Sequence, residues 1–312
     1  MNTGRQSFDA LLAGRAGGRP AWIPLVDEVA PRVAATSYRE LSTDPGLWTA
    51  GLLGATELLG ADALVAGFDF TLAAEACGAE LAWAGPQPVI VRPPAEISSE
   101  PLAAPRQAAL LETLRRLGAT AHTHIGLVAA LIGPATLALQ LCPDLPLEDG
   151  LRRVRTAHTA MAEAVLKARP DLILFIERLS GTGLEPPRAW QRAFATLRNL
   201  AGYYAVPTAM YLEGWTMPQL AGLATLQMRV YWLGEGEGDA LSAARVLAVG
   251  PTGVGVPVPG PGTGGAREVL DAVRAAREDG RNFFLTTAGV IGGQEDLAGL
   301  RALATELHEV AA

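Results

Sequence analysis

Short apolar runs alternate with longer segments of helical periodicity, and this alternation is the feature that most restricts the fold of the chain. It is typical of a parallel sheet whose connections are helices. Eight runs are rich in aliphatic and β-branched residues, and they lie at 22–26, 63–67, 125–131, 172–177, 208–213, 228–233, 254–258 and 283–287. Open doubly wound sheets more often have about five or six strands. The pattern therefore predicts an α/β protein with a closed (β/α)8 barrel, the TIM-barrel fold.

Segments with helical periodicity lie between the apolar runs, as a barrel requires. They cover residues 45–59, 105–117, 147–168, 188–201, 264–277 and 295–310. A barrel of eight βα units needs roughly 250 residues, so the 312 residues of this chain allow one barrel with an N-terminal extension. We therefore predict a single domain over residues 1–312.

Residues 249–265 form the most irregular part of the chain, VGPTGVGVPVPGPGTGG. Their glycine and proline density excludes a long helix. Two interpretations remain open for this segment. It is either a tight loop around a short strand or a flexible cover over an active site.

Charge and hydropathy exclude several classes of partner. The net charge is −7 and the acidic residues are scattered, so we expect neither a nucleic-acid site nor a polybasic membrane patch. Every apolar run is interrupted before the roughly 18 residues that a membrane span needs. The first residues, MNTGRQSFDALLAGR, lack the apolar core of a secretory signal. We expect a cytoplasmic protein that acts on a small molecule.

The cysteines and two of the histidines carry no evident chemistry. Cys77 and Cys142 have no CxxC-type spacing, so neither a disulfide framework nor a thiolate zinc site is indicated, and we expect both to be buried apolar residues. His158 lies in a helical segment and His308 near the C-terminus, and we expect both at the surface.

Polar residues at the carboxyl ends of barrel strands are the first candidates for function, because the loops there build the active site of this fold. They are Asp69, with Phe68 beside it, His124 next to the third strand, Glu177, Tyr211 with Glu213, and Thr287 with Thr286. Position and residue type alone predict a barrel with an acidic mouth.

Structural roles compete with functional ones at these positions. Asp69 is equally suited to cap a helix formed by TLAAEACG. Glu177 is followed by Arg178, and a structural ion pair explains this spacing at least as well as a substrate contact. His122 and His124 alternate as on a strand, but without a third ligand they more often form structural hydrogen bonds than bind a metal.

Several segments together resemble the uroporphyrinogen decarboxylase superfamily over most of the chain. They are FDALLAGRAGGRPAWIPLV, the stretch from SYRELSTDPG to FDFTLAAEACGAEL, HIGLVAALIGPATLALQL, LFIERLSGTGLEP and FFLTTAGVIGGQEDLAGLRALATELHE. The form FDFTLAAEACG is more similar to the cobalamin-linked methyltransferases of the superfamily than to its decarboxylases. The resemblance implies a barrel, a small-molecule substrate and a homodimer, and it makes Asp69 the counterpart of the central aspartate of the decarboxylases.

The chain departs from both branches at the positions that the resemblance makes important. Where the decarboxylases hold substrate carboxylates with two arginines, this chain reads PLVDEVAPR, and Asp27 and Glu28 would repel such a substrate. The methyltransferases bind zinc through a His-x-Cys pair and a later Cys, but those places hold Tyr211, Glu213 and Thr287 here. Because imidazole and thiolate are missing, we expect no zinc site and no tightly bound cofactor.

The resemblance leaves three hypotheses. The first is methyl transfer between a corrinoid, such as methylcobalamin or a corrinoid protein, and a small acceptor. In this hypothesis Asp69, Glu213 and Tyr211 are catalytic, and Phe68, His124, Glu177 and Thr287 bind the substrate. The second is a cofactor-free decarboxylase of a small carboxylate that depends on Asp69. The third is a barrel without catalysis that binds a partner.

Overall fold

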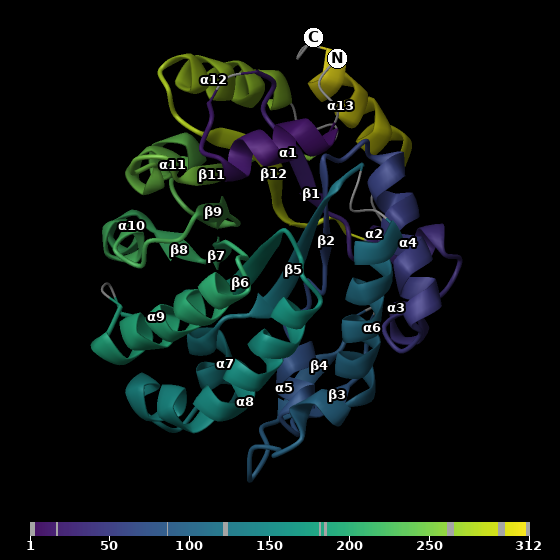
Figure 1. The fold of residues 1–312 in the computed structure, drawn as a ribbon, viewed down its shortest axis with the longest axis vertical. Coiled ribbons are helices and arrows are strands. Elements are labelled where there is room, and N and C mark those ends of the chain that lie inside the picture. The colour runs from purple at the N-terminus through teal and green to yellow at the C-terminus, as the bar shows by residue number, and fades with distance from the viewer. Residues whose placement is uncertain are drawn as a thin grey trace.

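The computed structural model describes residues 4–16, 18–85, 87–120, 124–180, 182–183, 186–260, 265–292 and 297–309. Eight parallel strands form one sheet that curls into a nearly closed barrel (Figure 1). In sheet order they are β1 (Trp22–Leu25), β12 (Phe283–Val290), β11 (Gly253–Pro257), β9 (Val230–Leu233), β7 (Thr208–Glu213), β6 (Leu172–Arg178), β5 (Gly126–Ile132) and β2 (Ala63–Ala66). Each strand coincides with one of the eight predicted runs, so the TIM-barrel prediction is confirmed.

Helices surround the sheet, as the periodic segments predict. The longer ones are α4 (Pro45–Leu58), α6 (Pro105–Thr120), α8 (Leu147–Lys167), α9 (Arg188–Tyr203), α12 (Ala266–Glu278) and α13 (Leu297–Glu309). Their apolar stripes face the strands, where Trp48 of α4 and Trp190 of α9 are fully buried. No helix in the described part of the chain has the length and apolar character that a membrane span requires.

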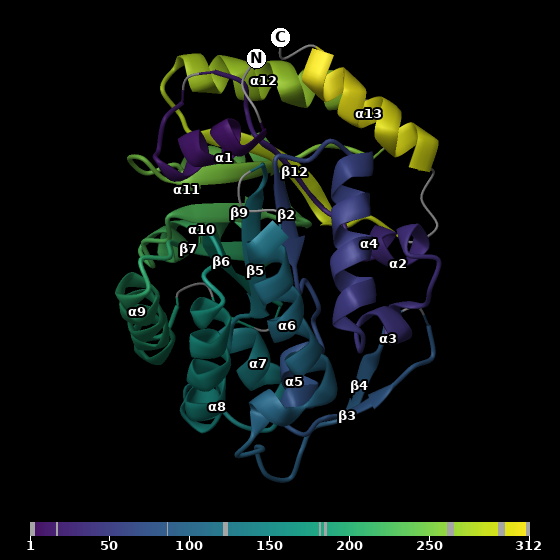
Figure 2. The ribbon, with the colours of Figure 1, turned by 45° about the vertical axis from the view of Figure 1, so that its right-hand side comes forward.

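The periodicity analysis missed the shorter elements. These are α2 (Val29–Val33), α3 (Tyr38–Leu41), α5 (Leu72–Ala76), α7 (Pro134–Leu141), α10 (Met217–Ala224), α11 (Ala240–Leu247), the hairpin of β3 (Glu80–Ala82) and β4 (Val89–Arg92), and the pair β8 (Trp215–Thr216) and β10 (Gly236–Glu237). Helices of four to eight residues are too short for a periodic pattern to stand out. Both views show the β3–β4 hairpin outside the barrel, beside α5 (Figures 1 and 2).

Hydrogen bonds of a single residue, Asp62, connect β1 to β2 and so close the barrel. These two strands share no ladder, and Asp62, just before β2, bridges them. Its backbone N–H donates to the Trp22 carbonyl at 2.8 Å, and its carboxylate accepts from the Trp22 N–H at 2.8 Å. Arg19 holds the same carboxylate in a bidentate pair at 2.7 and 2.5 Å. The seam therefore depends on a largely buried carboxylate at the amino ends of the strands.

Helix α1 (Gly4–Leu12) closes the same end of the barrel, which accounts for the predicted N-terminal extension. Arg5 forms a bidentate pair with Asp171, at the start of β6, at 2.7 and 2.8 Å. The ring of Phe8 is fully buried against Gly126, where a Cβ would lie 2.2 Å from the ring. Only glycine fits there, so α1 can seat its aromatic side chain directly on β5.

The interior of the barrel is filled by side chains. The indole of Trp232 donates to Thr286 Oγ1 at 2.6 Å, and its ring meets Phe284 edge to face at 4.7 Å. Cys77 and Cys142 are free and buried, as expected. His158 was expected at the surface, but it is 2% exposed, because α8 turns it toward β5. The segment 249–265 contains β11, which matches the strand predicted at 254–258, and residues 261–264 lie outside the described residues.

Replacement of Phe8 by Ala should lower the free energy of unfolding by about 3–5 kcal/mol, because it removes a fully buried aromatic ring from the closed end of the barrel. Chemical denaturation measures this change. The control is Tyr203→Ala, at an 83% exposed aromatic residue, which should change the free energy by less than about 1 kcal/mol. Equal effects of the two substitutions would contradict a structural role for the Phe8 contact.

Candidate functional site

Asp69 follows β2 at the carboxyl end of the barrel, and its side chain is 1% exposed. One oxygen accepts hydrogen bonds from the backbone N–H of Thr71 at 2.6 Å, the hydroxyl of Thr71 at 2.8 Å and the N–H of Leu72 at 3.1 Å. These bonds cap the start of α5. The other oxygen accepts from the Tyr38 hydroxyl at 2.8 Å and from Arg106. Asp69 is therefore a helix cap and the centre of a buried network at once.

Arg106 of α6 supplies the positive charge of this network and is 3% exposed. Besides Asp69, its guanidinium donates to Glu75 at 2.9 Å and to the Ser42 hydroxyl at 3.0 Å. It also lies over the ring of Trp83, 5.2 Å from the centroid. Burial of an arginine at this depth is tolerated because carboxylates and an aromatic face surround it.

Asp27, directly after β1, is a second carboxyl group at this end of the barrel and is completely buried. Neither of its oxygens has a hydrogen-bond partner among the described residues. Burial and the negative charge of Asp69 raise the pKa of Asp27 well above its ordinary value, although the backbone N–H groups of Phe68 and Gly67 act in the opposite direction. Asp27 and Asp69 thus receive unequal support, because Asp69 accepts five hydrogen bonds.

Tyr211, in β7, projects into the barrel and is 1% exposed. Its ring meets Phe68 edge to face at 4.8 Å, and its hydroxyl donates to the Ala288 carbonyl at 2.6 Å. A Cβ on Gly234 would lie 2.2 Å from this hydroxyl, so glycine is required where β9 ends. Burial, with the negative charges of Glu213 and Glu235, raises the pKa of Tyr211. Tyr211 therefore keeps its hydroxyl proton, and it lies across the barrel from β2, the strand that precedes Asp69.

Glu213, at the end of β7, forms an ion pair with Arg178 at 2.9 Å, and the two side chains are 26% and 44% exposed. The Arg178 guanidinium also stacks over Phe70 at 4.1 Å. Phe70 in turn meets Phe68 edge to face at 5.8 Å. Aromatic contacts therefore connect the β7 side of the mouth with the residues that flank Asp69.

Thr287 lies in β12, and its hydroxyl donates to the Gly289 carbonyl at 2.7 Å and accepts from the Leu25 N–H at 3.1 Å. It joins β12 to the end of β1, two residues before Asp27. The structure thus brings together Phe68, Asp69, Tyr211, Glu213 and Thr287 at the carboxyl ends of the strands.

Glu177 is not part of this group, because its side chain faces α7 on the outside of β6. It is completely buried and accepts hydrogen bonds from the N–H groups of Ala135 and Thr136, the Thr136 hydroxyl and the Trp190 indole at 2.6–3.1 Å. These donors oppose the effect of burial, which raises the pKa of Glu177 to about 7. Its carboxyl group holds the start of α7 against β6, which leaves it no contact with the mouth.

His124 also lies apart from the site, because it precedes β5 and is exposed at the opposite end of the barrel. All eight strands are parallel, so a residue that precedes β5 (Gly126–Ile132) lies at the amino ends of the strands, whereas the mouth is at their carboxyl ends. His122 lies outside the described residues.

The side chains at the positions of the methyltransferase zinc ligands do not fit zinc. Tyr211 donates its hydroxyl proton to a carbonyl, Glu213 is paired with Arg178, and the Thr287 hydroxyl is used within the backbone of β12. Among the described residues, no group of three or more His, Cys, Asp or Glu side chains is arranged to hold a metal ion. The chemistry proposed below therefore does not involve zinc.

Sequence reasoning did not select Asp27, Tyr38 or Arg106 as site residues. Asp27 directly follows the first strand, so the rule that selected Asp69 could have found it. Tyr38 and Arg106 come from helices, and no pattern along the chain indicates that their side chains reach Asp69.

An eight-stranded barrel with polar groups at the carboxyl ends of its strands defines the class to which this protein belongs, the TIM-barrel proteins. The model of the uroporphyrinogen decarboxylase (URO-D) family matches residues 5–250. The chain belongs to the uroporphyrinogen decarboxylase family. A comparison with curated protein sequences found no match.

Solved structures agree on the fold. A methyltransferase from Methanosarcina mazei aligns over 100% of both chains with a TM-score of 0.80 and 21% identity. A B12-independent methionine synthase from Shewanella sp. W3-18-1, in complex with selenomethionine, aligns over 95% of this chain and 96% of its own with a TM-score of 0.56 and 15% identity. A putative vitamin-B12 independent methionine synthase from Listeria monocytogenes aligns over 94% and 96%, with a TM-score of 0.54 and 15% identity. At these identities the likeness concerns the fold.

Replacement of Asp27 by Asn should stabilise the protein at neutral pH. The pKa of Asp27 is higher in the folded protein than in the unfolded chain. As the pH rises above the ordinary aspartate pKa of about 3.9, the unfolded chain therefore ionises more readily than the folded protein, and the free energy of unfolding falls. Asn has no such penalty, and the gain over the wild type should grow from acidic to neutral pH by about 1.4 kcal/mol for each unit of raised pKa. Denaturant unfolding across this pH range measures it. Asp144→Asn, at an exposed site, is the control and should show no such trend. Destabilisation of Asp27→Asn at neutral pH would contradict a neutral Asp27.

Proposed function

We propose that this protein is a zinc-independent methyltransferase that moves a methyl group between a corrinoid and the heteroatom of a small molecule. The observation that carries the proposal is the buried Asp27 carboxyl, which has no hydrogen-bond partner among the described residues and lies beside Asp69 at the barrel mouth. Two carboxyl groups whose surroundings favour opposite protonation states are a common sign of acid–base chemistry. The solved methyltransferase of similar fold is consistent with methyl transfer, whereas the methionine synthases of similar fold are B12-independent and lend no support to the corrinoid.

Asp27 is suited to be the proton donor of such a transfer. When a small molecule CH3–X–R gives up its methyl group, the C–X bond breaks and its electron pair stays on X. The proton of Asp27 passes to X, and the methyl carbon accepts an electron pair from the reduced corrinoid. In the reverse direction the Asp27 carboxylate takes the proton from HX–R. A corrinoid carried by a partner protein supplies or receives the methyl group.

The other residues of the site set the charge and the shape of the surroundings of Asp27. Asp69, fixed by Arg106 and Tyr38, keeps a negative charge near Asp27 and so helps to retain its proton. Tyr211, Phe68 and Phe70 form an aromatic wall across the barrel. The loop after β9 is rich in glycine, and its exposed Glu235 and Glu237 are the side chains that would face an approaching corrinoid protein.

The charge of the mouth favours methyl transfer over decarboxylation. Acidic residues predominate at and after the carboxyl ends of the strands; besides Asp27, which carries a proton in this proposal, they are Glu28, Asp69, Glu213, Glu235 and Glu237. The arginines beside them, Arg106 and Arg178, are already paired with Asp69 and Glu213. An anionic carboxylate substrate would meet repulsion here, whereas a neutral or cationic methyl compound would not.

The test is an assay of methyl transfer to cob(I)alamin, with methyl ethers, methylamines and methyl thioethers as donors. The change in the corrinoid spectrum measures the rate. The wild-type protein should turn over at least one compound, and Asp27→Asn should lower kcat by about 100-fold or more, the typical range for loss of a general acid. A metal chelator should leave the rate unchanged. Asp144→Asn should behave as the wild type.

The pH profile separates a chemical from a structural role of Asp27. If Asp27 donates the proton, kcat should fall as the pH rises through its raised pKa, and this limb should vanish in Asp27→Asn. Retained turnover in a folded Asp27→Asn variant, or inactivity of the wild type with the whole panel in both directions, would refute the proposal.

A further inference from the structure

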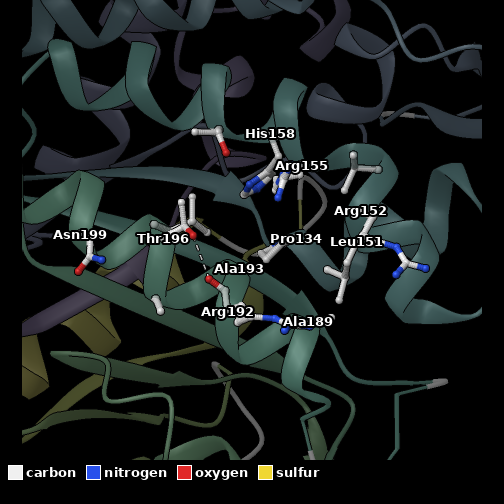
Figure 3. Close-up of a pocket in the computed structure, with 14 residues that line it drawn as sticks. Pro134, Leu151, Arg152, Arg155, His158, Ala189, Arg192, Ala193, Thr196 and Asn199 are labelled. Carbon is white, nitrogen blue, oxygen red and sulfur yellow. Dashed lines mark hydrogen bonds between the residues drawn. The ribbon is translucent and has the colours of Figure 1, made fainter.

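A groove of about 570 Å³ lies on the outside of the barrel between α8 and α9 (Figure 3). Its volume is in the range of sites that hold small molecules. The gap exists because α9 presents Ala189, Ala193 and Thr196 to α8, and these side chains are too small to fill the space between the helices. Apolar side chains complete much of the lining, among them Leu151, Val154 and Pro134.

Arginines from both helices surround the groove. Arg152 and Arg155 belong to α8 and Arg192 to α9, and Figure 3 shows them around the same space. Arg152 is paired with Asp149. Neither Arg155 nor Arg192 has a side-chain hydrogen bond or an ion pair with any described residue, and both are exposed. Two uncompensated guanidinium groups therefore face one cavity.

The charge of α9 is opposite to that of the chain as a whole. The helix RAWQRAFATLRNLAGY contains three arginines and no acidic residue, in a protein with a net charge of −7. Arg188 and Arg198 line a second groove of about 490 Å³ on the other side of α9, which shares Arg192 with the first. Such a concentration of positive charge favours an anionic ligand.

His158 adds a hydrogen-bond acceptor to the groove. Its Nε2 lies 2.8 Å from the Ile132 carbonyl, and because a carbonyl only accepts, this nitrogen carries the proton. Burial lowers the pKa of His158 to about 4, so the ring is neutral near pH 7 and Nδ1 is an acceptor. Nδ1 has no hydrogen-bond partner among the described residues, although the residue is only 2% exposed and lines the groove.

We propose that this groove binds a small organic phosphate. Arg155 and Arg192 would hold the phosphoryl oxygens through charge-assisted hydrogen bonds. A hydroxyl or amino group of the ligand would donate to His158 Nδ1, and its carbon skeleton would lie on Leu151, Val154 and Pro134. The concave apolar floor and the buried acceptor favour a small ligand over the acidic surface of a protein.

Isothermal titration calorimetry tests the proposal with adenosine 5′-monophosphate, ribose 5-phosphate and glycerol 3-phosphate, each compared with its unphosphorylated form and with inorganic phosphate. At least one phosphorylated compound should bind in the micromolar range, and at least about tenfold more tightly than either its unphosphorylated form or inorganic phosphate. If no member of the panel binds even in the millimolar range, the proposal is wrong.

Variants distinguish a built site from general electrostatic attraction. Arg155→Glu and Arg192→Glu should each weaken binding by about tenfold or more. Ala193→Phe, which fills the groove without changing the charge, should abolish it. Arg267→Glu makes the same charge change at an exposed position of α12 and should leave binding unchanged. Melting curves confirm that each variant is folded.

Two outcomes would overturn the proposal despite observed binding. If Ala193→Phe leaves binding intact while the charge reversals remove it, the arginines form an open anionic-partner surface rather than a small-molecule site. If Arg267→Glu weakens binding as much as Arg192→Glu does, the attraction is non-specific. Because no residue of the proposed methyl-transfer site lines the groove, these results do not depend on the methyl-transfer proposal.

Discussion

The seam between β1 and β2 is the constraint on which the arrangement of the site depends. No ladder joins these strands, so side chains must close the barrel there. At the amino ends Asp62 bridges the strands and is neutralised by Arg19. At the carboxyl ends the residues that follow the strands, Asp27 and Asp69, are both buried, and the charge of Asp69 acts on Asp27. The same closure that completes the fold therefore brings two carboxyl groups into one buried environment.

The two carboxyl groups receive unequal support from their surroundings. Asp69 accepts five hydrogen bonds, one of them from Arg106, whereas Asp27 has no hydrogen-bond partner among the described residues. Burial of a polar group without a partner costs about 1–3 kcal/mol, and folding tolerates such a cost where function requires it. The arrangement makes Asp27 the proton donor in our proposal, whereas the negative charge of Asp69 helps Asp27 to retain its proton. The family resemblance, in contrast, makes Asp69 the central residue of the site.

Charge is distributed unevenly over the barrel. The mouth is acidic, and the outer surface around α9 is basic. Opposite potentials on two faces allow the protein to bind two chemically different ligands without competition between them. In our proposals a methyl compound and a corrinoid meet at the acidic mouth, and an organic phosphate binds at the basic groove.

The sequence by itself determined the barrel, because each of its eight strands is a continuous apolar run buried on both faces, and such runs are visible without the fold. It also determined that Asp69, Tyr211, Glu213 and Thr287 follow or end strands, and hence that they share one end of the barrel. The same rule places His124 at the opposite end, because it precedes its strand. Only the tertiary structure decided which side of a strand a residue such as Glu177 faces, and its side chain turns outward to α7. Tyr38 and Arg106 reach Asp69 from helices 31 and 37 residues away in the chain. Contacts over such separations depend on how the helices pack on the closed sheet, and no local pattern of residues encodes them.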